Sequence, residues 1–157
     1  MGEQSIASLA GAVEVTRAGS VFCFQSTVHQ EASGKFLEQI AAHDPAAIHV
    51  VIQAGADFHL PEHDPRLPAN VRVITLPAYS PELNPVEKLW DHLKDAICKW
   101  IFANVEELRG ALAGWLEEFW SDAGRALSLI GRGWLLAAGC WLLAAGFSKR
   151  WCRMSMT

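Results

Sequence analysis

The carboxylate with the most informative surroundings is Glu87, which lies in the stretch LPAYSPELNPVEKLW at residues 76–90. Asn84 is a preferred helix N-cap residue, Pro85 suits the first helical position, and Glu87 then falls at the third. A glutamate there can close a capping box on the backbone N–H of the N-cap residue. Held at the start of a helix by a proline-stiffened turn, it could instead be a catalytic or metal-binding carboxylate. The spacing alone leaves both roles open.

A second group of polar residues lies further upstream, between two apolar runs. His59 and His63 are four residues apart, which on a helix would resemble a pair of metal ligands. Pro61 lies between them and argues against a helix, so the sequence does not favour a histidine metal site. Asp57 precedes both histidines, and its simplest interpretation is an ordinary turn aspartate.

The elements expected to position these residues alternate between strands and helices. Thr27 and Gln30 have the spacing of a capping box, which predicts the start of the first helix. Trp90 and Trp100 are expected to pack in the core. In chain order, the prediction is strands at 9–16 and 20–25, a helix from Thr27 to about 42, strands at 48–52 and 71–76 around a loop at 53–70, and helices after Pro85 and at 105–120. This alternation predicts an α/β sheet with helices on its faces.

The string Leu-Pro-x-Tyr-Ser-Pro-Glu-Leu-Asn-Pro-x-Glu-Lys-x-Trp resembles the signature of bacterial insertion-sequence transposases related to the mariner family. These are members of the DDE superfamily, so the resemblance implies an RNase H-like catalytic domain, with a mixed sheet and flanking helices. It also implies DNA as the substrate and two Mg²⁺ or Mn²⁺ ions that promote DNA cleavage and strand transfer in transposition. In this resemblance Glu87 matches the family's third metal-binding carboxylate.

The same resemblance implies two aspartates that this chain does not match. The family's first Asp lies on a first strand, and residues 1–8 contain no apolar strand ending in Asp. That strand is central in the RNase H-like sheet, between the hairpin and the strand at 48–52, so its absence would leave two unpaired edges. The second Asp aligns with Ala54, and Asp57 stands three residues later as a weaker candidate. The predicted catalytic and metal-binding residues are therefore Glu87 and Asp57, with a fragment that binds no metal as the alternative.

Composition narrows the class of protein. The 157 residues are 51% hydrophobic and 19% charged, as expected for one folded domain. A net charge of −4 does not favour a module that grips DNA phosphates by charge, and the family's helix-turn-helix segment is missing. DNA contact is therefore expected to be weak, with a homo-oligomer or a complementing transposase chain as the other partners to consider. Four scattered cysteines and the lack of a signal peptide indicate a cytoplasmic protein without disulfides or zinc.

The C-terminal part contains a direct repeat, because residues 134–139 and 141–146 both read WLLAAG. A seven-residue period returns the same residues to nearly the same helix face, which predicts an apolar helical tail over 122–157 after a catalytic domain at 1–121. The uncharged run at 133–147 is 15 residues long, shorter than the roughly 20 residues that a membrane-spanning helix needs. A membrane contact is therefore disfavoured.

The leading functional prediction is a truncated, catalytically inactive fragment of a DDE transposase. Inactivity is predicted because Glu87 is the only one of the three expected carboxylates that stands at its expected position. An active nuclease would need another polypeptide to supply the missing strand and its Asp. A different class of function is a small membrane-associated or protein-interaction protein that uses the C-terminal apolar repeat.

Overall fold

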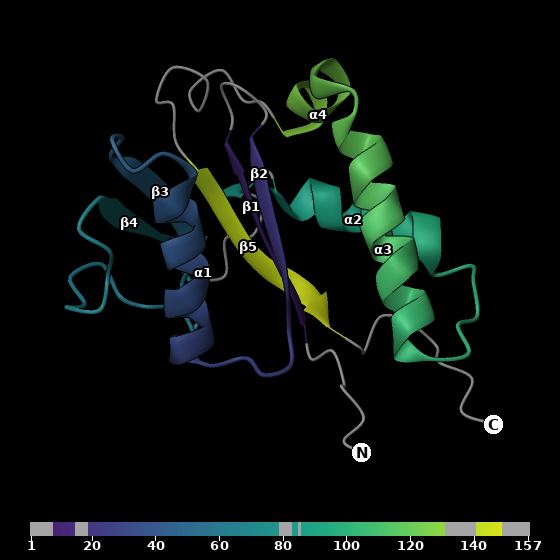
Figure 1. Cartoon of the computed structure of the whole chain (residues 1–157), viewed down its shortest axis with the longest axis horizontal. Coiled ribbons are helices and arrows are strands. Elements are labelled where there is room, and N and C mark those ends of the chain that lie inside the picture. Colours follow the sequence, from purple (N-terminus) through teal and green to yellow (C-terminus); the bar gives the residue numbers. More distant parts are fainter. Residues whose placement is uncertain (1–7, 15–18, 79–82, 85, 131–140, 149–157) are drawn as a thin grey trace.

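The computed structural model describes residues 8–14, 19–78, 83–84, 86–130 and 141–148. This part of the chain forms a five-stranded mixed sheet with helices packed against it (Figure 1). The strands are β1 (Ser8–Glu14), β2 (Ser20–Gln25), β3 (His49–Ala54), β4 (Val71–Leu76) and β5 (Trp141–Ser148). The helices are α1 (Gln30–His43), α2 (Val86–Ile97), α3 (Val105–Trp120) and α4 (Ala123–Ile130). The predicted α/β class is confirmed.

Two pairs of neighbouring strands match the sequence prediction. β1 and β2 form an antiparallel hairpin, in register from Ser8↔Gln25 to Val13↔Ser20. β3 and β4 pair in parallel, in register from His49↔Val71 to Ala54↔Leu76. The nearly continuous apolar sequence of β3 suits a parallel strand that is covered on both faces. Residues 15 and 16 of the predicted first strand lie outside the described residues.

The fifth strand joins these two pairs into one sheet, with the strand order β2-β1-β5-β3-β4. β5 runs antiparallel to β1, from Glu14↔Trp141 to Ser8↔Ser148. On its other edge it runs parallel to β3, from Val51↔Trp141 to Gln53↔Leu143. Among the described strands, β5 is therefore the link between the hairpin and the parallel pair.

The prediction of a helical tail is wrong for residues 141–148, although α4 in the same tail is a helix. Periodicity cannot distinguish a buried strand from a buried helix in a short apolar run. The edges of β1 and β3 decide the outcome, because a strand between them pairs backbone N–H and C=O groups on both of its sides. The expected gap between the hairpin and β3 is filled, and it is filled by the C-terminal part of the chain. The first copy of the repeat, at 134–139, lies outside the described residues.

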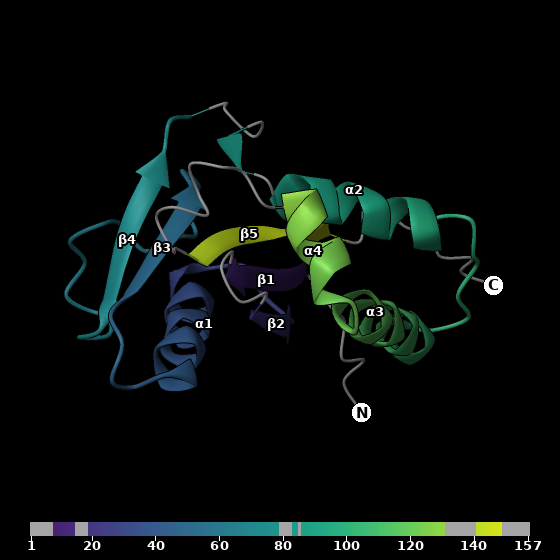
Figure 2. The same ribbon diagram turned by 90° about the horizontal axis from the view of Figure 1, so that it is seen from above.

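Alternate residues of each strand point to opposite faces of the sheet. Leu9, Val13 and Ile52 belong to a core cluster with α2, α3 and α4, whereas Ala10, Val51 and their alternating neighbours belong to a second cluster with α1. Figure 2 shows α1 and α2 on opposite sides of the sheet. Helical periodicity in α2 is confirmed by its buried stripe of Val86, Leu89, Trp90, Leu93 and Ile97.

Two local predictions are wrong. α1 is capped by His29, whose ring Nδ1 accepts a hydrogen bond from the backbone N–H of Ala32 at 3.2 Å. Thr27 is not the N-cap residue, and its hydroxyl instead contacts Nε2 of His29 at 3.0 Å. Trp100 is 67% exposed rather than in the core, because α2 ends at Ile97 and the helical periodicity used to place Trp100 ends with it.

Candidate functional site

Glu87 lies in the first turn of α2, where the predicted cap is present in part. The side-chain oxygen of Asn84 accepts a hydrogen bond from the backbone N–H of Val86 at 3.2 Å. The backbone N–H of Glu87 donates to the carbonyl of Asn84 at 3.1 Å. Within the described part of the chain, no hydrogen bond reaches the Glu87 carboxylate from the N-cap backbone, so the reciprocal half of the predicted capping box does not form. The carboxylate is therefore not engaged as a cap.

The surroundings of Glu87 disfavour its charged form. The side chain is half-buried, and desolvation by burial raises the pKa of its carboxyl above the ordinary value of 4.5. The cation of Lys94, about two helical turns further along α2, lowers this pKa, while the carboxylate of Asp91 raises it. Burial is therefore the main reason why the protein disfavours the charged form of this carboxyl.

Glu87→Gln is expected to change how stability depends on pH. Because the folded-state pKa of Glu87 is raised, its favourable contribution is present below pH 4.5 and is lost as the pH rises through the folded-state value. The variant should therefore be as stable as the wild type or slightly more stable at pH 7. The difference should stay below about 1 kcal/mol because solvent screens a partly exposed group. Urea unfolding of both proteins at pH 4 and pH 7 measures this difference in stability. A variant that is less stable than the wild type only at pH 7 would contradict a raised pKa for Glu87.

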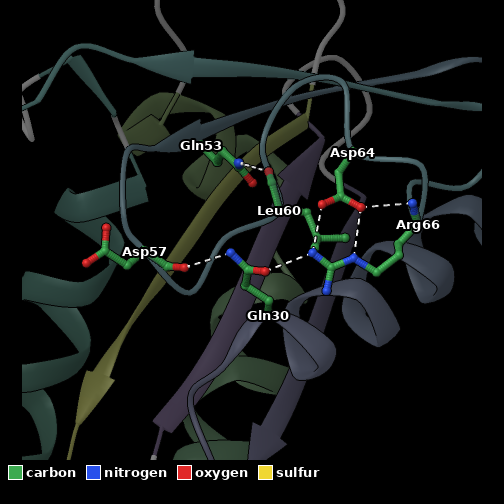
Figure 3. Close-up of polar contacts among 6 residues, drawn as sticks. All are labelled: Gln30, Gln53, Asp57, Leu60, Asp64 and Arg66. Carbon is green, nitrogen blue, oxygen red and sulfur yellow. Dashed lines mark hydrogen bonds and ion pairs between the residues drawn. The ribbon is translucent and has the colours of Figure 1, made fainter.

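The second predicted carboxylate, Asp57, lies in the loop that follows β3. Its side chain is exposed, and its backbone carbonyl accepts a hydrogen bond from Nε2 of Gln30 at 3.1 Å. Figure 3 shows the carboxylate of Asp57 pointing away from Gln30. Gln30 is the first residue of α1, so the backbone of Asp57 is fastened to the helix on the face opposite α2.

A network of polar side chains fixes this loop against α1 (Figure 3). Nε2 of Gln53 donates to the carbonyl of Leu60 at 2.8 Å. Nη2 of Arg66 donates to Oε1 of Gln30 at 2.8 Å and forms an ion pair with Asp64 at 2.7 Å. The hydrogen bonds from Arg66 lower the pKa of Asp64 to about 2, so this pair stays charged over the physiological range. The loop is tied at both ends, which limits any movement that would bring Asp57 towards Glu87.

His59 is buried, whereas His63 is exposed, and no helix spans the two, as predicted. Nδ1 of His59 lies 2.7 Å from the carbonyl of Ala54, so this nitrogen carries the proton and donates. Burial lowers the pKa of His59, which keeps the ring neutral at pH 7. The histidine thus holds the end of β3 to the following loop, a structural role.

An open depression of about 390 Å³ lies where β3 and β4 end. Gln53, Ala54, Asp57 and Thr75 are among its lining residues, and Glu87 is not. The carboxyl ends of parallel strands are common places for ligand sites. Among the residues that the structure describes, however, no three His, Cys, Asp or Glu side chains gather closely enough to hold a metal ion. The described residues therefore do not fit a two-metal centre.

Ala54 stands where the resemblance predicts the second metal-binding carboxylate. It follows Ile52 by two residues on β3, so it lies on the face of the sheet that α2 covers. A carboxylate at this position would lie on the same side of the sheet as Glu87, but alanine supplies no oxygen. The sequence-based assignments of Glu87 as the third carboxylate and of Ala54 in place of the second stay predictions. Sequence reasoning missed Gln30, Gln53 and Arg66, because their contacts join residues up to 36 positions apart and leave no local pattern.

Comparison with known protein families matches residues 2–109 to the DDE superfamily endonucleases. The match covers well over half of the 157 residues, and the chain belongs to this family. Nucleases of the family act on DNA and generally use divalent metal ions. A search of curated proteins and a search of solved structures gave no match. In the described part of the chain, no helix is both long and apolar enough to cross a membrane.

Proposed function

We propose that this chain is a transposase-type catalytic domain, related to the mariner-like insertion-sequence enzymes, that does not cut DNA on its own. The reaction class is metal-dependent DNA cleavage and strand transfer in transposition. Support comes from the family match over residues 2–109 and from the motif at 76–90, which leads into α2. The mixed sheet, with an antiparallel hairpin on one side and a parallel pair on the other, is consistent with an RNase H-like arrangement.

The observation that carries the proposal of inactivity is Ala54. Two divalent cations held a few ångströms apart need several carboxylate oxygens, which activate the attacking oxygen and stabilise the leaving one. Glu87 supplies one carboxylate on the α2 side of the sheet, and Ala54, on the same face of the sheet, does not supply a second.

Asp57 does not compensate for Ala54. Its loop is fastened to α1 through Gln30, and α1 packs on the opposite face from α2. Further hydrogen bonds from Gln53 and Arg66 hold the same loop in place.

A strand-cleavage assay tests the proposal. The full chain is incubated with supercoiled plasmid and with linear duplex DNA in Mg²⁺ and in Mn²⁺, beside Glu87→Ala and Asp57→Asn. We expect the wild type to cut no faster than Glu87→Ala. Cutting by the wild type that is lost in Glu87→Ala would overturn the proposal. Further loss in Asp57→Asn would then identify Asp57 as the second carboxylate.

A further inference from the structure

The strand β5 occupies a slot whose two walls are backbone edges. All seven residues of β1 pair with β5 on one side, and Val51, Ile52 and Gln53 of β3 pair with it on the other. Without β5 those N–H and C=O groups would have no strand partner, and the hairpin would be separated from the parallel pair. The slot is thus a binding site for one extended segment.

Recognition in this slot depends mainly on the backbone. The middle of β1 is Ala10-Gly11-Ala12, which pairs with Ala145, Ala144 and Leu143. Small residues on β1 allow close approach of the backbones, and main-chain hydrogen bonds supply the affinity in complexes where a strand is added to a sheet edge. The segment WLLAAGFS carries no charge, which suits a central strand covered on both faces.

β5 also lies apart in sequence from the rest of the sheet. β1 to β4 all precede residue 77, whereas β5 follows α4 after the ten residues 131–140. Meanwhile α4 itself is anchored, because Ala126 and Ile130 are fully buried in the cluster with α2 and α3. The matched family region ends at residue 109, so β5 lies outside it.

We propose that the slot between β1 and β3 accepts β5 of a second copy of this chain in the same way as it accepts its own. A second copy presents the identical segment, so every pairing within the slot is reproduced. The two arrangements then differ only in the entropy of closing the loop and in chain concentration. The inference stands on the strand register and does not depend on whether the chain cuts DNA.

Two complementary variants of the full chain test this exchange. The acceptor chain carries Leu136→Pro and Leu143→Pro, so that neither copy of the repeat can serve as a central strand. Leu143 has register partners on both β1 and β3, so proline there interrupts the ladder where it is paired on both sides. The donor chain carries Ala12→Pro, which breaks β1 at a residue paired with both Val21 and Leu143.

Each variant alone should show no cooperative unfolding transition. An equimolar mixture refolded from urea should regain about half of the wild-type transition amplitude, because one complete sheet forms per pair of chains. Size-exclusion chromatography should place that material at the size of a dimer. The matched control adds Leu136→Pro and Leu143→Pro to the donor chain, and its mixture should stay unfolded. A mixture that remains as unfolded as its components, or an acceptor chain that folds alone, would overturn the proposal.

Discussion

Trp90→Ala should destabilise the domain by about 3–5 kcal/mol, the range for truncating a buried aromatic side chain. Trp90 is fully buried on α2, in the cluster that joins this helix to α3, α4 and one face of the sheet. Its ring meets that of Phe22 edge to face, with 6.2 Å between centroids. Because small domains are stable by only about 5–15 kcal/mol, the variant should lose a large part of its stability.

Trp100→Ala is the matched control, since it makes the same chemical change at an exposed position. Trp100 is 67% exposed in the turn after α2, so its removal should change stability by no more than about 0.5 kcal/mol. Urea unfolding followed by far-ultraviolet circular dichroism compares the two variants without relying on tryptophan fluorescence. Equal losses in both would show that Trp90 is not the core residue described above.

Gly11→Ala has the second-largest expected effect, a loss of about 1–3 kcal/mol from overpacking. A Cβ at Gly11 would lie 2.6 Å from Cε1 of Phe22 and 2.9 Å from Cη2 of Trp90. Phe22 is the register partner of Gly11 on β2, and its ring is itself held edge to face by Trp90 and Trp120. Neither ring can move away freely, so the added methyl group strains the core.

Gly114→Ala makes the same substitution where space is open. Gly114 is an exposed residue inside α3, and no atom outside the helix backbone lies within 4 Å of the Cβ it would gain. Alanine there should stabilise the protein by about 0.5–1 kcal/mol through its higher helix propensity. Opposite signs for the two variants in thermal unfolding are the expected result. A stabilising Gly11→Ala would contradict the close packing of β1 beneath α2.

Sequence patterns were sufficient where local rules decide the structure. The apolar run before Gln53 predicted β3, and the spacing of Asn84, Pro85 and Glu87 placed the start of α2. These features depend on residues within one turn of helix or one strand. The predicted start of α1 at Thr27 was wrong because His29, a less usual capping residue, accepts the hydrogen bond from the backbone N–H of Ala32.

β5 could not be predicted in the same way, because its conformation depends on distant partners. The segment at 141–148 is as apolar as a buried helix, and only the paired edges of β1 and β3 make it a strand. The resemblance did identify where a strand was needed, between the hairpin and β3. It did not indicate that the C-terminal part of the chain would supply it.

In the candidate site, too, some features follow from the local sequence and others depend on contacts between distant residues. Glu87 and Ala54 were assigned to the site from the motif and from the turn after β3, and these assignments stay predictions. The loop that carries Asp57 is held by hydrogen bonds from Gln30, Gln53 and Arg66, which only the folded chain brings together. The contacts that hold this loop therefore required the structure.

A Mn²⁺ titration of the full chain, beside Glu87→Gln, tests the central claim most directly, because it needs no knowledge of the DNA target. Isothermal titration calorimetry gives the number of ions bound, and the variant shows which of them depend on Glu87. Because no three His, Cys, Asp or Glu side chains gather closely enough in the described part of the chain to hold a metal ion, we predict no saturable pair of Mn²⁺ sites and indistinguishable titrations for the two proteins. Two ions bound per wild-type chain and lost in Glu87→Gln would contradict the claim, because they would show a complete metal centre.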